Sequence, residues 1–439
     1  MSDVEAKRGE AAEPVALEGR WTVCALLFVA TTINYMDRQV LSILKPILSG
    51  APLHLAPLLP GWPSVETSIR LTDEAYGNIL AAFQIAYALG VVFAGRLVDR
   101  LGCRKGYPLV TGVWSLAAMG HALVQSVAGF GVARFLLGLG ESGNFPAAVK
   151  ATAEWFPPRE RALATGIFNS GAGVGAILAP LAVPWVALHF GWRASFLMTG
   201  IFSALWIVWW SVRYRTPKQA AAAVAAPAAV DEHTRAWWKL LGHRQTWGFM
   251  AGKFLTDPVW WFFLFWLPQY FSSRFGMDLT HMGLPLAAIY VTSMVGSVYG
   301  GWLPKGFTRM GLTVKAGRLT AMLLCACLVV PVMSAGSLQN VWVAVALISV
   351  AAAAHQGWSA NIFTTVSDMF PSKHVGTVVS FGQVAGALGG ALFQPVAGHI
   401  LQLTGSYVPL FVYSALAYLL ALVLLRTLAP GLKRALPEG

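Results

Sequence analysis

About twelve apolar stretches, each near the length of a membrane-crossing helix, occupy most of this 439-residue chain. A helix needs roughly 20 apolar residues to cross the hydrocarbon core of a bilayer, and backbone there satisfies its own hydrogen bonds only as a helix or a closed barrel. Charged residues make up only 11% of the chain, and the mean hydropathy is +0.60. We therefore expect an all-α membrane protein with helices near 20–48, 76–98, 107–126, 128–150, 161–189, 194–213, 247–272, 281–303, 315–335, 339–368, 374–402 and 407–428.

The basic residues fall mainly on one side of the expected membrane. When both termini and the even-numbered connections are placed in the cytoplasm, most of the 31 Lys and Arg lie there. The exceptions are Arg70, Arg193 and Arg274 on the other side and Arg38, Lys45, Arg134 and Lys253 within helices. This is the positive-inside pattern. It predicts a multi-pass protein with cytoplasmic termini, and it accounts for the net charge of +12 without a nucleic-acid partner. The acidic first 20 residues predict no cleavable signal peptide.

An internal repeat divides the chain into halves. Glu154-Trp155-Phe156-Pro157 closes the fourth expected helix, and Asp368-Met369-Phe370-Pro371 closes the tenth, 214 residues later. We expect a cytoplasmic tail at 1–19, a six-helix bundle at 20–213, an Ala/Pro-rich cytoplasmic linker at 214–246, a second bundle at 247–428 and a tail at 429–439. Such a repeat predicts pseudo-symmetric bundles related by an axis along the membrane normal, with a site at their interface.

Ionisable residues lie inside several expected helices. They are Asp37 and Arg38 in the first, Arg134 and Glu141 in the fourth, Lys253 and Asp257 in the seventh, and His355 in the tenth. A charge in hydrocarbon is costly, so such groups face a cavity or a partner and mark a pathway. The repeat offset carries Glu141 onto His355, which predicts that the two face each other across one cavity. If the alignment of the two repeats is shifted by one residue, the position on the helix rotates by about 100° and the correspondence is lost.

The turn after the second expected helix carries a recognisable pattern, Gly95-Arg96-Leu97-Val98-Asp99-Arg100-Leu101-Gly102-Cys103-Arg104-Lys105. It resembles the signature loop of the major facilitator superfamily, in which twelve helices form two six-helix bundles. The likeness implies a cytoplasmic gate built on Gly95, Asp99, Arg100, Gly102 and Arg104, where Asp99 holds a neighbouring helix N-terminus or arginine in one state. The alternative is a charge cluster that only sets topology.

Four further runs resemble the anion:cation symporter branch of that superfamily, and within it bacterial hexuronate transporters. They are 34–41, 138–148, 253–262 and 354–363. The likeness extends from Arg20 to Arg426 and implies a proton-coupled symporter that imports glucuronate and galacturonate across the bacterial inner membrane. The chain departs from it in the long, proline-rich segment Ser49–Arg70 and at Ala172, where sugar-acid relatives can carry an amide. The exact substrate therefore stays open.

The first bundle supplies the expected proton carriers and the expected carboxylate receptor. Arg38 presents a planar fork of donors that suits a carboxylate; the alternative is a structural pair with Asp37 or Glu141. Glu141 lies among glycines where a helix or substrate can approach closely, and a carboxylate in a dry cavity binds a proton more readily than one in water. The resemblance adds Asp37 as a second proton-coupling residue, whose alternative role is to fix Arg38. Arg134, two turns from Glu141, would hold it or help to bind the anion.

The second bundle is expected to bind the sugar. Lys253 stands near Trp260 and Trp261, as a cation beside aromatic faces, while Asp257, four residues on, is equally a structural partner for Lys253. Further expected substrate-binding residues are His355, Gln356, Trp358, Ser359 and Asn361 in the tenth helix, Tyr87, which matches a family tyrosine in the second, and Asn34 in the first. The alternative for each is a satisfied buried polar or aromatic side chain.

The expected partners are a small anionic sugar acid, protons and lipid. The chain is expected to act as a monomer, without cofactor or metal. Two related functions remain open: proton symport of another sugar acid or small organic anion, such as galactonate or glucarate, and proton-driven export. An enzyme is disfavoured because the sequence has no nucleophile elbow, phosphate loop or metal cluster. A receptor is disfavoured because both tails are short.

Overall fold

The computed structural model describes residues 18–50, 69–217 and 238–435, which are helical apart from short turns. Its elements in chain order are α1 (Arg20–Leu48), α2 (Asp73–Gly120), η2 (His121–Leu123), α3 (Val127–Glu141), α4 (Asn144–Trp155), α5 (Pro158–Phe190), α6 (Trp192–Arg213), α8 (Arg244–Phe275), α9 (Gly283–Arg309), α10 (Val314–Val329), η4 (Val330–Ser337), α11 (Val341–Met369), α12 (Ser372–Thr404), α13 (Val408–Leu428) and η5 (Pro430–Leu432).

Within the described residues, these elements make twelve crossings of the expected membrane. The long α2 supplies two of them, because Gly102, at φ +70°, bends the chain where a side chain would be strained. By contrast, α3 and α4 together supply one, with a break at Ser142 and Gly143. Among the residues that the structure describes, eight helices are long and apolar enough to cross a membrane by length and composition alone. Two further long helices, α1 and α8, do not belong to that group, and both carry buried charged residues.

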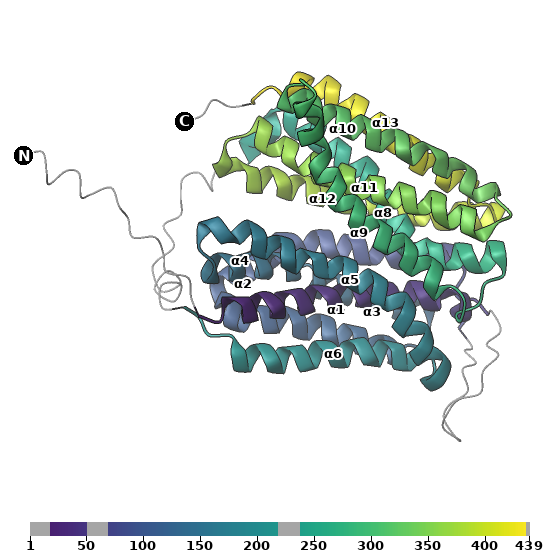
Figure 1. Cartoon of the computed structure of the whole chain (residues 1–439). Coiled ribbons are helices and arrows are strands. Elements are labelled where there is room, and N and C mark those ends of the chain that lie inside the picture. Colours follow the sequence, from purple (N-terminus) through teal and green to yellow (C-terminus); the bar gives the residue numbers. More distant parts are fainter. Residues whose placement is uncertain (1–17, 51–68, 218–237, 436–439) are drawn as a thin grey trace, which may run out of the picture.

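The helices gather into two bundles, α1 to α6 and α8 to α13 (Figure 1). In the first, α1 packs on α5 and α6, and α2 packs on α3; in the second, α8 packs on α12 and α13, and α9 packs on α11. The expected all-α fold of two pseudo-symmetric six-helix bundles is confirmed. α8 begins at Arg244, inside the segment expected to be linker, while 218–237 lie outside the described residues, as do most of the proline-rich segment (51–68) and of the N-terminal tail (1–17).

The bundles meet along α2 and α12, α5 and α9, and α1 and α8. The hydroxyl of Tyr76 donates to the carbonyl of Phe265 at 2.8 Å. A Cβ on Gly77 would lie 2.4 Å from the carbonyl oxygen of Gln394, so only glycine permits this approach of α2 to α12. We call the end of the bundles at which α1 begins and α13 ends the basic end, and the opposite end the distal end. These contacts lie toward the distal end.

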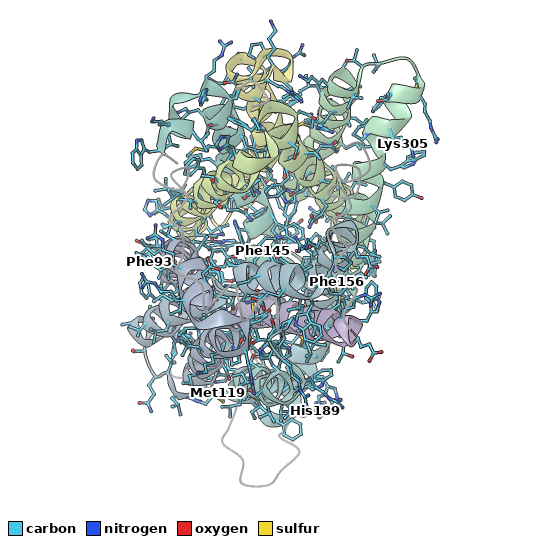
Figure 2. The ribbon with its side chains drawn as sticks, turned by 90° about the vertical axis from the view of Figure 1, so that its left-hand side faces the viewer. Phe93, Met119, Phe145, Phe156, His189 and Lys305 are labelled. Carbon is cyan, nitrogen blue, oxygen red and sulfur yellow. The ribbon has the colours of Figure 1, made fainter. Side chains whose placement is uncertain are left out.

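The apolar cores show the same asymmetry. One core joins both bundles, and from α1 it takes only residues from Met36 to Leu48, which lie in the distal half. The basic half of the first bundle has a separate core around Trp206 and Trp210. Figure 2, seen from the basic end, labels Phe145 on the surface of the first bundle that faces the second, and this side chain is 41% exposed. The bundles are thus closed together distally and diverge toward the basic end (Figure 1).

Candidate substrate and proton site

Arg38 and Glu141 form a buried ion pair between α1 and α3. Nε of Arg38 donates to Oε2 of Glu141 at 2.6 Å, and the residues are 3% and 0% exposed. Asn34, one turn before Arg38, lies beside Glu141. The close packing behind the pair depends on glycine, because a Cβ on Gly138 or Gly140 would lie 2.5 Å from the backbone of α2. Removing two charges from water costs considerable free energy of desolvation. A buried ion pair within a membrane helix bundle therefore indicates a candidate functional site.

Four aromatic rings surround the Arg38 guanidinium. Its Cζ lies 4.8 Å from the ring centre of Tyr35, 5.7 Å from Phe83, 5.0 Å from Tyr87 and 5.6 Å from Trp261. Ring faces attract a cation and do so more strongly when it is desolvated. Trp261 belongs to α8, so this box is made by both bundles. The structure thus brings two of the expected substrate-binding residues, Tyr87 and Trp261, to Arg38.

Arg134 and Asp37 complete a group of four buried charges. Nη2 of Arg134 donates to the carbonyl of Arg38 at 3.2 Å. Among the described residues, the other two nitrogens of Arg134, Oε1 of Glu141 and both carboxylate oxygens of Asp37 have no hydrogen-bond partner. Asp37 lies on another side of α1, beside Thr199 and Ser203 of α6. With two acids and two bases the group is neutral when fully ionised, and one bound proton leaves it at +1.

Lys253 and Asp257 form a second ion pair, within α8. Nζ of Lys253 lies 2.8 Å from Oδ1 of Asp257 and 4.3 Å from the ring centre of Phe363 in α11. The sequence had suggested Trp260 as the ring beside this lysine. The structure places Phe363 there instead. Trp260, two helical turns on, shares that face of α8 but is displaced about 10 Å along the helix axis and stacks on His355.

His355 is held on two sides. Its Nδ1 shares a hydrogen bond of 2.6 Å with the hydroxyl of Tyr418 in α13, and Trp260 stacks on its ring at 5.2 Å with an interplanar angle of 7°. His355 therefore contacts α8, the first helix of its own bundle, just as Glu141 contacts α1. Each residue thus contacts the first helix of its own half, as expected for residues related by the repeat. Whether they face each other across one cavity stays a prediction.

The other expected residues of α11 point in different directions. Nδ2 of Asn361 donates to the carbonyls of Gly300 and Gly357 at 2.7 and 2.8 Å, so this amide joins α9 to α11. Trp358 is fully buried and packs on Tyr418, while Gln356 and Ser359 are partly exposed. Four polar residues within seven positions cannot share one face of a helix with 3.6 residues per turn.

The two ion pairs and the histidine belong to one neighbourhood. Tyr35 is within electrostatic range of both Arg38 and Asp257, and His355 is within range of Lys253. Arg38, Glu141, Lys253 and His355 are all buried inside the protein. That they line one chamber stays a prediction.

The signature loop lies at the basic end. Asp99 binds Nζ of Lys150 in α4 at 2.8 Å, where an arginine or a helix N-terminus had been expected. Lys150 also donates to the carbonyls of Val98 and Asp99, each at 3.3 Å. Gly102 makes the bend described above, and a Cβ on Gly95 would meet nothing within 4 Å. The remaining expected members of the loop, Arg100 and Arg104, are exposed.

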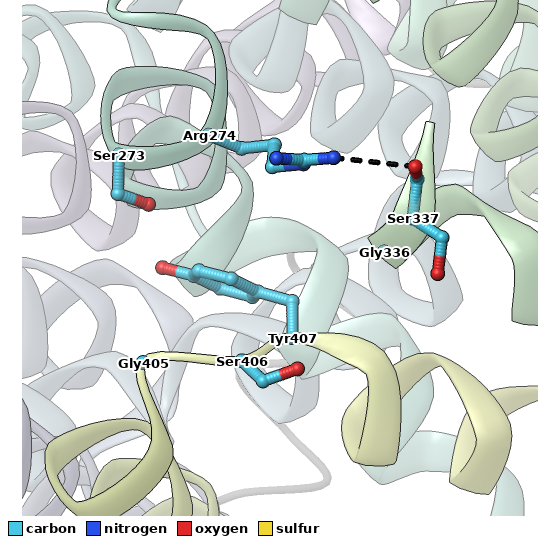
Figure 3. Close-up of a pocket in the computed structure, with 7 residues that line it drawn as sticks. All are labelled: Ser273, Arg274, Gly336, Ser337, Gly405, Ser406 and Tyr407. Carbon is cyan, nitrogen blue, oxygen red and sulfur yellow. Dashed lines mark hydrogen bonds between the residues drawn. The ribbon is translucent and has the colours of Figure 1, made fainter. Parts of the chain in front are cut away.

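A separate pocket lies at the distal end of the second bundle (Figure 3). Ser273, Arg274, Gly336, Ser337, Gly405, Ser406 and Tyr407 line it. Nη2 of Arg274 donates to the carbonyl of Ser337 at 3.2 Å, so part of this cation is already used to hold the rim together.

Sequence reasoning missed Tyr35, Lys150 and Tyr418. Tyr35 stands two residues before Asp37, where a contact with Arg38 three positions on could have been inferred from helical spacing. Lys150 stands out in the sequence only as one of the basic residues of the positive-inside pattern. Nothing in the sequence links Tyr418 to His355, because the two are 63 positions apart.

This arrangement can bind an anion and exchange a proton. Arg38 has a carboxylate partner in Glu141, and a protonated Glu141 would hold it less strongly. A free guanidinium in an aromatic box suits a carboxylate attached to a sugar ring. Among the described residues no three His, Cys, Asp or Glu side chains are placed to hold a metal ion.

The sequence pattern of the Major Facilitator Superfamily matches residues 27–393. The chain belongs to the major facilitator superfamily. It is a membrane transporter rather than an enzyme, and a multi-pass protein that acts on a small molecule within a lipid bilayer.

Similar transporters in this superfamily are named for sugar acids. The hexuronate transporter of Escherichia coli (strain K12) is 28% identical over 428 residues, which cover 93% of each chain. The galacturonate transporter of Dickeya chrysanthemi is 28% identical over 302 residues, covering 66% of this chain and 83% of the relative. The D-galactonate transporter of Escherichia coli O6:H1 (strain CFT073) is 26% identical and covers 92% of this chain and 94% of the relative.

Solved transporters share the fold. A D-xylose–proton symporter superposes with a TM-score of 0.71 at 15% identity, covering 94% of this chain and 98% of the other. An inward-facing, occupied bacterial homolog of the human lysosomal transporter Spinster superposes with a TM-score of 0.69 at 17% identity, covering 95% and 97%.

Proposed function

We propose that this transporter is a proton-coupled symporter that imports hexuronates, such as glucuronate and galacturonate, across the bacterial inner membrane by alternating access. The names of its relatives support the sugar-acid class. The uneven distribution of Lys and Arg supports cytoplasmic termini, with the basic end facing the cytoplasm. The proposed working unit is the monomer.

The observation that carries the proposal is the buried pair of Arg38 with Glu141, 2.6 Å apart. While Glu141 is ionised it occupies the guanidinium that an anionic substrate needs. When Glu141 takes up a proton, Arg38 and the unpartnered nitrogens of Arg134 become available to a sugar carboxylate. Asp37, which lies within electrostatic range of Arg134 and Glu141, is the second proposed proton carrier. Proton and substrate then bind together because each removes the obstacle to the other.

The second bundle is proposed to hold the sugar ring. Trp261 already lies over Arg38, so a ring attached to a carboxylate at Arg38 would reach α8. Lys253, Trp260, His355, Gln356 and Ser359 are the proposed partners for hydroxyl groups. Asp99 and Lys150, which join the signature loop to α4, are proposed to stabilise one conformation of the basic end.

Uptake into proteoliposomes tests the function. The purified full-length protein is reconstituted, a pH gradient (alkaline inside) is imposed, and entry of labelled glucuronate is followed. Transient accumulation that a protonophore abolishes is expected. Each unit of pH supplies about 1.4 kcal/mol, or a tenfold gradient, per coupled proton. Uptake that only equilibrates, with or without the gradient, would contradict proton coupling. Loss of preloaded glucuronate driven by an acidic exterior would indicate export.

A second candidate is proton symport of another sugar acid. The relatives named D-galactonate transporter and probable galactarate/D-glucarate transporter, at 26% and 27% identity, favour it. Competition of glucuronate uptake by galacturonate, galactonate and glucarate separates the two candidates. Stronger inhibition by galactonate or glucarate than by either hexuronate would favour the second.

A further inference from the structure

The contact between α2 and α12 is a seam in which glycines of each helix receive groups of the other. A Cβ on Gly77 would lie 2.4 Å from the carbonyl oxygen of Gln394, and one on Gly398 would lie 2.4 Å from the carbonyl oxygen of Asp73. Further from the distal end, Gly390 of α12 faces the side chain of Gln84 in α2. The two helices are antiparallel, so Gln84 lies deepest of these contacts, toward the middle of the membrane.

The side chain of Gln84 is fully buried, and its amide group has no hydrogen-bond partner in the part of the chain that the structure describes. Its exposure is 0%, and among the described residues neither Nε2 nor Oε1 has a partner. Buried amides in folded proteins are nearly always paired, and an unpaired one needs an explanation. Gln394, the other buried glutamine of the seam, differs at its oxygen, since Oε1 accepts from the indole of Trp266 at 2.6 Å, while its Nε2 has no partner among the described residues.

The amide of Gln84 lies beside the aromatic box of Arg38. A Cβ on Gly390 would be 3.2 Å from Cδ of Gln84 and 3.0 Å from Cδ1 of Trp261, so both side chains converge on this glycine. Trp261 is the ring that lies 5.6 Å from the Arg38 guanidinium. Gln84 also follows Phe83, a second ring of that box, directly in the chain.

We propose that Gln84 binds a hydroxyl group of the sugar acid whose carboxylate Arg38 holds, in the conformation in which the α2–α12 seam is open. An amide offers two donors and an acceptor, which suits a hydroxyl that both donates and accepts. In the closed seam Gly390 covers the amide and leaves it unsatisfied. Separation of α12 from α2 uncovers it next to Arg38. This inference rests on the proposed function and adds a specificity residue to it.

If Gln84 had only a structural role, its replacement would change ligand affinities in a different way. If the unpaired amide only weakens the closed seam, replacing it shifts the equilibrium between conformations, and every ligand of the open form changes affinity by the same factor. If Gln84 binds a hydroxyl, the change depends on whether the ligand carries that hydroxyl. A cycle of protein variant against ligand analogue separates the two.

The experiment uses full-length wild type, Gln84→Leu and Gln394→Leu in proteoliposomes. Inhibition constants against labelled glucuronate uptake are measured for unlabelled glucuronate and for its 2-, 3- and 4-deoxy analogues. Wild type is expected to bind one of the analogues roughly tenfold more weakly than glucuronate, which matches the net contribution of one typical hydrogen bond. Gln84→Leu should bind glucuronate about tenfold more weakly and lose discrimination against that analogue. Gln394→Leu, the same change in the same seam, should keep it.

Equal discrimination by wild type and Gln84→Leu for all three analogues would overturn the role of Gln84 while leaving the proposed function intact. Absence of glucuronate uptake and inhibition in wild type would refute the proposed function itself. Should Gln84→Leu fail to insert or fold, Gln84→Met, whose side chain has nearly the same length, provides the same comparison.

Discussion

Replacing Glu141 by Gln removes one charge from the site and little else. The two side chains have the same shape, and the amide oxygen of Gln can still accept from Nε of Arg38, which lies 2.6 Å from Oε2 of Glu141. The buried group of four charges changes from neutral to +1 at every pH at which Asp37 is ionised. The variant therefore resembles a wild-type protein in which Glu141 is permanently protonated.

The size of the effect follows from the geometry of the pair. With this contact the charge centres are about 4 Å apart, where unit charges attract by about 4 kcal/mol at an effective dielectric constant of about 20. A substrate carboxylate must compete with that attraction while Glu141 is ionised. Since about 1.4 kcal/mol is a tenfold change in affinity, removal of the competitor strengthens binding by at most about 10³-fold. The attraction is divided because Arg134 also lies within electrostatic range of Glu141, so we expect a gain of at least tenfold at alkaline pH.

Calorimetric titration of glucuronate into the protein in lipid nanodiscs, from pH 5.5 to 8.5, measures this effect. The sugar carboxylate stays ionised throughout, because carboxyl groups of this kind titrate near pH 3 to 4. Wild-type affinity should fall as pH rises, since loss of the proton from Glu141 returns Arg38 to its pair. Glu141→Gln should bind tightly at pH 8.5 and vary much less with pH. Asp278→Asn, which removes an exposed carboxylate between α8 and α9, should behave as wild type. A pH dependence in Glu141→Gln as steep as in wild type would refute the reasoning.

Three other substitutions test the fold and the second bundle. Gly77→Ala places a methyl group 2.4 Å from a backbone carbonyl of α12 and should destabilise the closed distal end by about 1–3 kcal/mol, which is measured as a lower melting temperature. The control Gly95→Ala, which has open space around it, should melt at the wild-type temperature. Equal melting temperatures for the two variants would contradict the close approach of α2 to α12. Tyr418→Phe removes the hydroxyl that holds His355 and should raise KM for hexuronate several-fold, while an unchanged KM would show that this histidine does not need its partner. Lys253→Gln should raise KM roughly tenfold, a loss of about 1.4 kcal/mol; normal KM with reduced expression would instead assign Lys253 to stability.

The sequence was sufficient to predict the fold class because lipid allows so few solutions. Apolar stretches of the right length had to be helices, and the match between Glu154-Trp155-Phe156-Pro157 and Asp368-Met369-Phe370-Pro371 identified the two halves. It could not predict that the second and third crossings form one bent helix at Gly102, or that the fourth is broken at Ser142 and Gly143. Such features depend on backbone angles that hydropathy does not record.

The ion-pair partner of a charged residue was harder to predict than its position along a helix. Adjacency on one helix correctly suggested the pair of Lys253 with Asp257, because residues four apart share a face. Pairs between helices were left open: Arg38 had two candidate partners, and Asp99 was expected to bind an arginine or a helix end rather than Lys150. The choice depends on the rotation of each helix about its axis, which packing against its neighbours decides.

The amino-acid sequence by itself determined that this chain crosses a membrane in two related halves and that it keeps ionisable residues within the bilayer, since both properties follow from the cost of exposing polar groups to hydrocarbon. The tertiary structure alone decided which of those residues meet. It set Arg38 against Glu141 within rings from both bundles and left Gln84 buried and unpaired at the seam. The physical reason is that the free energy of a buried polar group depends on the atoms packed against it, and those atoms come from segments far apart in the chain.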